Sequence, residues 1–110
     1  EQGVIREWVA RSRILIEQAR LMVLNAAERM DKVGPKGARQ EIAMIKVAAP
    51  AMLFQVLDWA IQAHGAAGVT VDSGLAYSYA RARTMRIVDG PDEVHLVQLG
   101  KSEIARWATA

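Results

Sequence analysis

The sequence predicts an all-α antiparallel helical bundle, and three observations point to this fold class. Apolar residues recur at three- and four-residue steps over two long segments. No segment alternates apolar and polar residues in the way that a half-buried strand does. Glycine and proline lie mostly between the periodic segments, where they end one helix and begin the next. A chain of 110 residues is one domain at most, so residues 1–110 are assigned to a single helical domain.

The first helix is predicted from residue 3 to about residue 31. Trp8 and Met22 belong to its apolar stripe, and arginine and glutamate residues mostly fall between the stripe positions. Gly34 can end this helix, and Pro35 suits the opening of the next one. A helix of this length is typical of a bundle.

The second helix is predicted from residue 38 to about residue 64. Its apolar positions continue in register on both sides of Pro50, so we predict that this proline kinks the helix and does not end it. The stretch from Gly65 to Gly68 ends the helix. The first two helices should therefore lie antiparallel, because only a short loop joins them.

Two shorter helices are predicted after residue 71. Residues 69–71 should be extended or irregular, and Asp72 or Ser73 can cap a third helix that ends at about Arg83. Pro91 lies near the start of a fourth helix over about residues 91–107. The corner between these two helices contains Asp89.

Composition excludes several classes of function. The chain has no cysteine, which rules out disulfides, thiolate metal sites and a cysteine nucleophile. Its two histidines, His64 and His95, lie far apart in sequence, so a metal site is not indicated. The net charge is +2 with both signs interspersed, and this gives no strong nucleic-acid footprint. Every long apolar segment carries charged residues, so no transmembrane segment is expected.

Asp89 is the main candidate for chemistry, and the residues alone leave two interpretations open. A carboxylate at such a corner can cap the next helix by accepting bonds from the free N–H groups of its first turn. It can also be a catalytic base held on a fixed backbone corner. Asp92 and Glu93 suit the positive end of the fourth helix in either case.

Three stretches resemble a known family. They are Gln62-Ala-His-Gly-Ala-Ala-Gly68, Arg83-Thr-Met-Arg-Ile-Val-Asp-Gly-Pro-Asp-Glu-Val-His95, and the run from Glu41 to Pro50. Together they resemble the C-terminal domain of acyl-CoA dehydrogenases, and most closely the branch of family members ten and eleven. The likeness covers nearly the whole chain. It implies a helical bundle that closes over flavin and thioester, normally with one further helix before the first one seen here. The chain also begins without Met or a signal pattern, so we expect a fragment of a larger acyl-CoA dehydrogenase that lacks the first bundle helix.

The resemblance implies a FAD-dependent enzyme that forms the α,β double bond of a fatty acyl-CoA. Asp89 matches the catalytic base, which takes the proton α to the thioester carbonyl while flavin takes the β-hydride. The family usually has Glu at this position, and the branch that this chain resembles most has Asp. An α-proton beside a thioester is only weakly acidic, so its base must be aimed at it and shielded from water.

The resemblance also implies two groups of cofactor contacts. The residues after the base match positions that touch flavin or substrate, and they are Gly90, Pro91, Asp92 and Glu93. Pro91 replaces a frequent Thr and supplies neither its hydroxyl nor its N–H, and Glu93 replaces a frequent Gln. A second group matches positions that contact the pyrophosphate side of flavin from the neighbouring subunit, namely Gln62, Ala63, His64, Gly65 and Ala66. Gln2 matches a further flavin-contacting position.

The partners implied by the resemblance are a fatty acyl-CoA substrate, electron-transferring flavoprotein or oxygen as electron acceptor, and further copies of the chain in a dimer or tetramer. Members of the family occur in mitochondria and peroxisomes and in the cytoplasm of bacteria. We expect this fragment alone to be inactive. The alternative function is a non-catalytic helical bundle that serves oligomer assembly, in which Asn or Ser would serve at position 89 as well as Asp.

Overall fold

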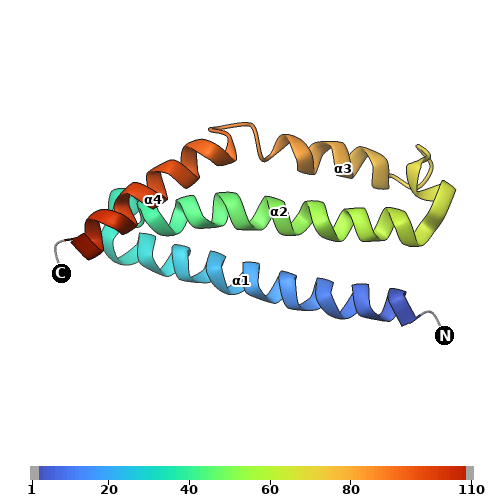
Figure 1. Cartoon of the computed structure of the whole chain (residues 1–110), viewed down its shortest axis with the longest axis horizontal. Coiled ribbons are helices and arrows are strands. Elements are labelled where there is room, and N and C mark those ends of the chain that lie inside the picture. The colour runs from blue at the N-terminus through green and yellow to red at the C-terminus, as the bar shows by residue number, and fades with distance from the viewer. Residues whose placement is uncertain (1–2, 109–110) are drawn as a thin grey trace.

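The regular structure of this chain is entirely helical over residues 3–108, the part described in a computed structural model. Its elements are α1 (Gly3–Gly37), α2 (Arg39–His64), the short 3-10 helix η1 (Gly65–Val69), α3 (Leu75–Thr84) and α4 (Asp92–Ala108). The two long helices α1 and α2 run antiparallel, and α3 and α4 return along the other side of α2 (Figure 1). The predicted all-α antiparallel bundle is therefore confirmed.

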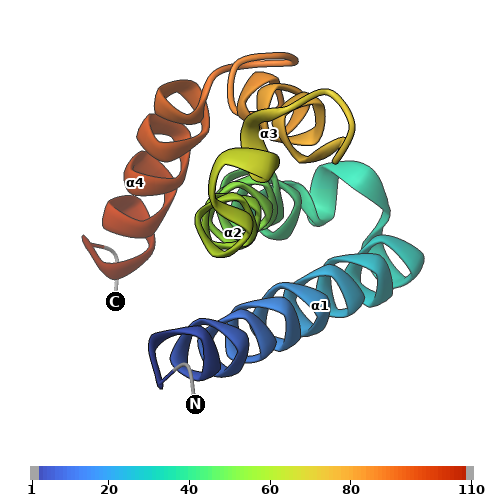
Figure 2. The same cartoon turned by 90° about the vertical axis from the view of Figure 1, so that its right-hand side faces the viewer.

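Helix α2 is the element around which the others are arranged. It packs against α1, η1, α3 and α4, whereas no Cα atom of α1 lies within 8 Å of one in α3 or α4 in the described range. The view along the long axis shows α2 between α1 on one side and α3 and α4 on the other (Figure 2). By length and composition alone, α2 with η1 is the one described helix that is apolar enough to cross a membrane, with a mean hydropathy of 1.4. Its contacts are nevertheless those of the central helix of a bundle.

Proline and glycine act on the first two helices as predicted. Gly34 has φ 77° and ψ 173°, which breaks the helical backbone, and Pro35 begins the single turn that follows. The first helix therefore runs a few residues beyond the predicted end near residue 31. Helix α2 continues through the buried Pro50, so the prediction that this proline does not end the helix is confirmed.

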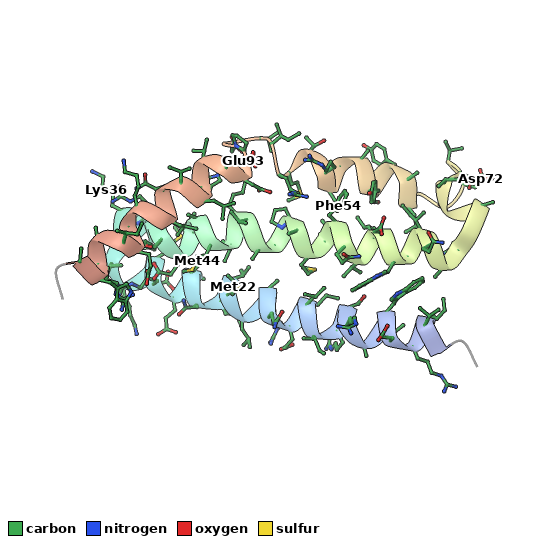
Figure 3. All side chains as sticks on the ribbon, viewed as in Figure 1. Met22, Lys36, Met44, Phe54, Asp72 and Glu93 are labelled. Carbon is green, nitrogen blue, oxygen red and sulfur yellow. The ribbon has the colours of Figure 1, made fainter. Side chains whose placement is uncertain are left out.

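Two predictions for the following segment need correction. Val69 was expected to be extended or irregular, but it is the last residue of η1, and the extended backbone starts at Thr70 (φ −84°, ψ 159°). The N-cap of α3 is Gly74, so neither predicted cap occupies that position, although the Leu75 N–H donates to the Ser73 Oγ at 3.2 Å. Asp72 makes no such bond in the described structure and lies at the far end of the bundle (Figure 3).

Gly68 lets η1 pack directly against the end of α2. A Cβ atom at this buried position would lie 2.5 Å from the Ile61 carbonyl oxygen and 2.9 Å from its Cα, so the backbone would have to shift. We expect Gly68→Ala to lower the free energy of unfolding by about 1–3 kcal/mol. Gly100→Ala is the matched control, because a Cβ there meets nothing within 4 Å and alanine favours a helix interior. Thermal unfolding of both variants checks this, and equal midpoints would contradict it.

The side chains that are fully buried are small. Apart from Pro50, the buried apolar side chains in the described range are all alanines, and no large side chain there is fully enclosed. Apolar hollows lie along both sides of the contact between α1 and α2, where Trp8, Trp59 and Met52 line the walls. Many large apolar side chains thus remain in contact with solvent when the chain is alone.

We expect the isolated 110-residue chain to self-associate, because burying these apolar walls against another copy removes apolar surface from water. Sedimentation should then show a mass-average molecular weight that rises with concentration. A single monomeric species over a wide range of concentration would contradict this.

Candidate functional site

The backbone at Asp89 has a conformation that residues other than glycine rarely adopt. Asp89 has φ 53°, and it is the only residue besides glycine with positive φ in the described range. Gly90 follows with φ 96°. A left-handed conformation costs a residue with a Cβ about 1–2 kcal/mol, so the surrounding structure must hold it.

Two sets of contacts hold the corner at Asp89, and the first is made by Lys46 on α2. Its Nζ donates to the carbonyl oxygens of Met85 and Val88, both at 2.8 Å, and of Gly90 at 3.3 Å. These bonds join residues 39 to 44 positions apart in the chain. The corner is therefore fixed to the middle of α2.

The second contact is an ion pair within the turn. Arg86 Nε donates to Asp92 Oδ2 at 2.7 Å, and the Asp92 N–H donates to the Arg86 carbonyl at 3.0 Å. The guanidinium also lies 5.9 Å from the ring centroid of Phe54, which stacks on Tyr79 with centroids 4.4 Å apart. Phe54 lies between α2 and α3 (Figure 3). This group connects the start of α4 to both of those helices.

Asp89 does not cap α4. Helix α4 begins at Asp92, and the Val94 N–H donates to the Pro91 carbonyl. The exposed Asp89 carboxylate accepts no hydrogen bond and forms no ion pair within residues 3–108. The capping interpretation is therefore wrong for this residue, and its carboxylate is free to act on a ligand.

A pocket of about 440 Å³ lies beside Asp89. It is formed by α1, α2, the corner and the start of α4, and most of its wall is apolar. Its lining residues are Val23, Ile42, Ile45, Lys46, Ala49, Pro50, Met85, Asp89 and His95. A carboxylate on the edge of an apolar pocket suits the removal of a proton from carbon, because such a wall accepts a hydrocarbon chain and limits water.

His95 packs under the corner. A Cβ at Gly90 would lie 3.0 Å from its Nε2, so a side chain at this position would crowd the ring. That Nε2 is buried and makes no hydrogen bond in the described structure. Neither histidine had a partner predicted from the sequence, and the position of His95 in the same pocket as Asp89 was not predicted either. His64 lies elsewhere, and its Nδ1 donates to the Ala60 carbonyl at 2.7 Å.

The residues that follow Asp89 differ in their surroundings. Pro91 and Glu93 are exposed, and Glu93 lies at the outer start of α4 (Figure 3). Asp92 is only 6% exposed, and one of its oxygens is bound by Arg86. The flavin contact of Asp92 stays a prediction. Its bond to Arg86 shows that Asp92 also stabilises the fold.

The second predicted group lies at the other end of α2. Residues 62–66 form the last turn of α2 and the start of η1, and all five are exposed. Pro50 lines the pocket and Gln62 is twelve residues further along the helix, which corresponds to about 18 Å. A single copy of the chain therefore does not bring Asp89 and the residues after it close to residues 62–66. Gln2 lies outside the described residues.

The open surface at residues 62–66 is compatible with a bound phosphate-rich group. Gly65 has φ 61°, and a Cβ there would meet nothing within 4 Å, so a ligand can approach the backbone closely. The Gln62 amide makes no hydrogen bond in the described range and can donate to a ligand. This chain thus offers small residues and a free amide where the flavin contacts were predicted.

The fold and these motifs are those of a helical domain of a dehydrogenase. A sequence model of the acyl-CoA dehydrogenase C-terminal domain matches residues 1–104, and the chain belongs to this family.

Among its relatives, mouse acyl-CoA dehydrogenase family member 11 is 54% identical over 113 residues, which cover all of this chain and 14% of that protein. Mouse family member 10 is 53% identical over 94% of this chain and 10% of that protein. A solved structure from Mycobacterium abscessus assigned to the acyl-CoA dehydrogenases is 47% identical, with a TM-score of 0.94 over 97% of this chain and 26% of its own. The predicted branch and fold are thus confirmed, and the chain spans a small part of each relative.

Proposed function

We propose that this chain is the C-terminal domain of a larger FAD-dependent acyl-CoA dehydrogenase, and that Asp89 is its catalytic base. The observation that carries the proposal is the state of the Asp89 carboxylate. It is held in a left-handed corner, it has no hydrogen-bond partner in the described range, and it borders an apolar pocket.

In the proposed reaction the substrate loses one hydrogen from each of two neighbouring carbons. Asp89 takes the α-hydrogen as a proton, and the electron pair of that C–H bond becomes part of the new α,β double bond. Bound flavin supplies the acceptor for the β-hydrogen, which leaves with its electron pair as hydride. The oxidised product is the α,β-unsaturated acyl-CoA.

The described residues contribute position and shielding to this reaction. The apolar wall formed by Ile42, Ile45 and Ala49 holds the acyl chain beside the carboxylate. Limiting water matters because a hydrated carboxylate is a weaker base and is less well aimed. Gly90 allows the backbone after the base to lie close to substrate and flavin.

The residues at the end of α2 are proposed to contact the flavin of a neighbouring subunit. Their separation from Asp89 along α2 is compatible with contact to the flavin of a second copy of the chain. A homodimer or homotetramer follows, with apolar surface of α1 and α2 available for contact. Electron-transferring flavoprotein or oxygen would reoxidise the flavin.

Anaerobic titration of the flavin-loaded full-length protein with acyl-CoAs of increasing chain length tests the proposal. Flavin absorbance should bleach with at least one chain length, because hydride transfer reduces the flavin. A flavin-loaded protein that no acyl-CoA bleaches would contradict the proposed function. The isolated 110-residue chain is expected to bleach no flavin, since the remaining flavin-binding parts lie outside it.

A further inference from the structure

We propose that Lys46 is the positioning residue of the catalytic base, and that it sets the direction of the Asp89 carboxylate from the middle of α2. This inference rests on the proposed function, in which Asp89 takes the α-proton. It assigns a role to a residue that is neither a base nor a ligand contact.

The donors of Lys46 match the acceptors of the corner in number. An ammonium group has three N–H bonds and no acceptor. Three carbonyl oxygens lie within hydrogen-bond distance of Nζ, those of Met85, Val88 and Gly90. Each N–H can therefore donate to one carbonyl, and all three donors of the ammonium group then bond the backbone of the corner.

These carbonyls bracket the strained part of the chain. The Val88 carbonyl belongs to the peptide unit just before Asp89, and the Gly90 carbonyl belongs to the unit just after Gly90. The two residues with positive φ lie between these two units. Lys46 thus fixes both ends of the segment that directs the carboxylate, and without it the segment can relax to ordinary dihedrals.

Lys46 also leaves the base free. It lines the same pocket as Asp89, but the two side chains form no ion pair within 4.0 Å in the described structure. Because its donors bond carbonyl oxygens, the cation does not occupy the carboxylate that must accept the proton. A lysine paired directly with Asp89 would compete with the substrate for those oxygens.

The position of Lys46 on α2 links the base to the substrate wall. Ile42, Ile45, Ala49 and Pro50 line the pocket from the same helix. One rigid element therefore sets both the place of the acyl chain and the place of the base. This matters because a small misplacement of a reacting group lowers a rate steeply.

Stopped-flow flavin reduction by acyl-CoA in the full-length, flavin-loaded enzyme tests this role. We expect Lys46→Met to lower the limiting rate of reduction by about 10- to 100-fold. The acyl-CoA concentration for half-saturation and the flavin content should change little, because the pocket wall and the cofactor contacts remain. Lys46→Arg keeps a cation with several donors and should recover part of the rate.

The matched control is Lys32→Met on α1. Lys32 is exposed and bonds only Glu28, at 2.7 Å, so the same change in side chain should leave the rate as it was. Should Lys46→Met fail to retain flavin, Lys46→Gln replaces it, because its shorter amide has only two N–H donors and cannot bond all three carbonyls. A parental rate in whichever variant retains flavin overturns the positioning role.

A double-mutant comparison separates this inference from the proposed function. If Lys46 acts through the base, adding Lys46→Met to Asp89→Asn should cost no further rate. An equal cost in both backgrounds would mean that Lys46 acts on something else, and would overturn the inference while the base assignment stands. If Asp89→Asn alone reduces flavin like the parent, the proposed function itself fails.

Discussion

Asp89→Asn is expected to lower the rate of flavin reduction by acyl-CoA about 1,000-fold, while flavin and acyl-CoA still bind. The amide has nearly the same size as the carboxylate and cannot accept the α-proton, and a positioned general base contributes about 100- to 10,000-fold. The carboxylate makes no hydrogen bond in the described range, so its replacement should disturb no contact of the fold. Anaerobic stopped-flow absorbance of the flavin-loaded full-length protein gives the rate.

Asp58→Asn is the control for this prediction. Asp58 is an exposed residue of α2 that does not line the pocket of Asp89, so its neutralisation should leave the rate as it was. A similar rate in the Asp89→Asn variant and the parent would place the base elsewhere. The alternative function, a non-catalytic helical bundle that serves oligomer assembly, would then explain this domain better.

Arg86→Met is expected to lower the free energy of unfolding by about 2–3 kcal/mol. The change leaves the Asp92 carboxylate, whose side chain is 8% exposed, without its only cation. Removing one partner of a buried pair costs about 3–5 kcal/mol, and the lower figure reflects the 34% exposure of the Arg86 side chain. The contact with Phe54 is lost as well. Thermal unfolding of the flavin-loaded protein at a fixed scan rate measures the effect.

Arg20→Met provides the matched comparison, because Arg20 pairs with Glu17 at 3.0 Å on the exposed face of α1. Such surface pairs contribute about 1 kcal/mol or less. Adding Asp92→Asn to Arg86→Met should restore part of the loss, since a buried amide is less costly than a buried unpaired charge. Equal unfolding midpoints for Arg86→Met and Arg20→Met would refute the prediction.

The helices could be predicted from the sequence because their signals are local. The apolar period marks α1 and α2 directly, and Gly34 with Pro35 marks the break between them. The start of α3 was less certain, because Asp72 and Ser73 are both good caps and the choice depends on the backbone of Gly74. Val69 was misplaced because η1 results from the contact of Gly68 with Ile61, which no short-range pattern encodes.

The candidate site was predicted only in part, for a related reason. Asp89 stood out through its place beside glycine and proline, but the residues alone did not separate a cap from a base. The structure excludes the cap, because the Asp89 carboxylate has no partner among the described residues, and the role of base stays a proposal. Lys46 was not found, because its acceptors are backbone carbonyls about 40 positions away, and any residue type supplies a carbonyl. A functional contact of this kind has no signature in the sequence.

The central position of α2 also determines which helices of this domain a destabilising substitution affects. Since no Cα atom of α1 lies within 8 Å of one in α3 or α4 in the described range, we expect the docking of α1 and that of α3 and α4 to form two cooperative units that share one helix. A substitution that loosens the Arg86 ion pair weakens the α3 and α4 unit and leaves the hairpin of α1 and α2 intact. Local opening around the base can therefore occur without unfolding of the surface that α1 presents to other chains.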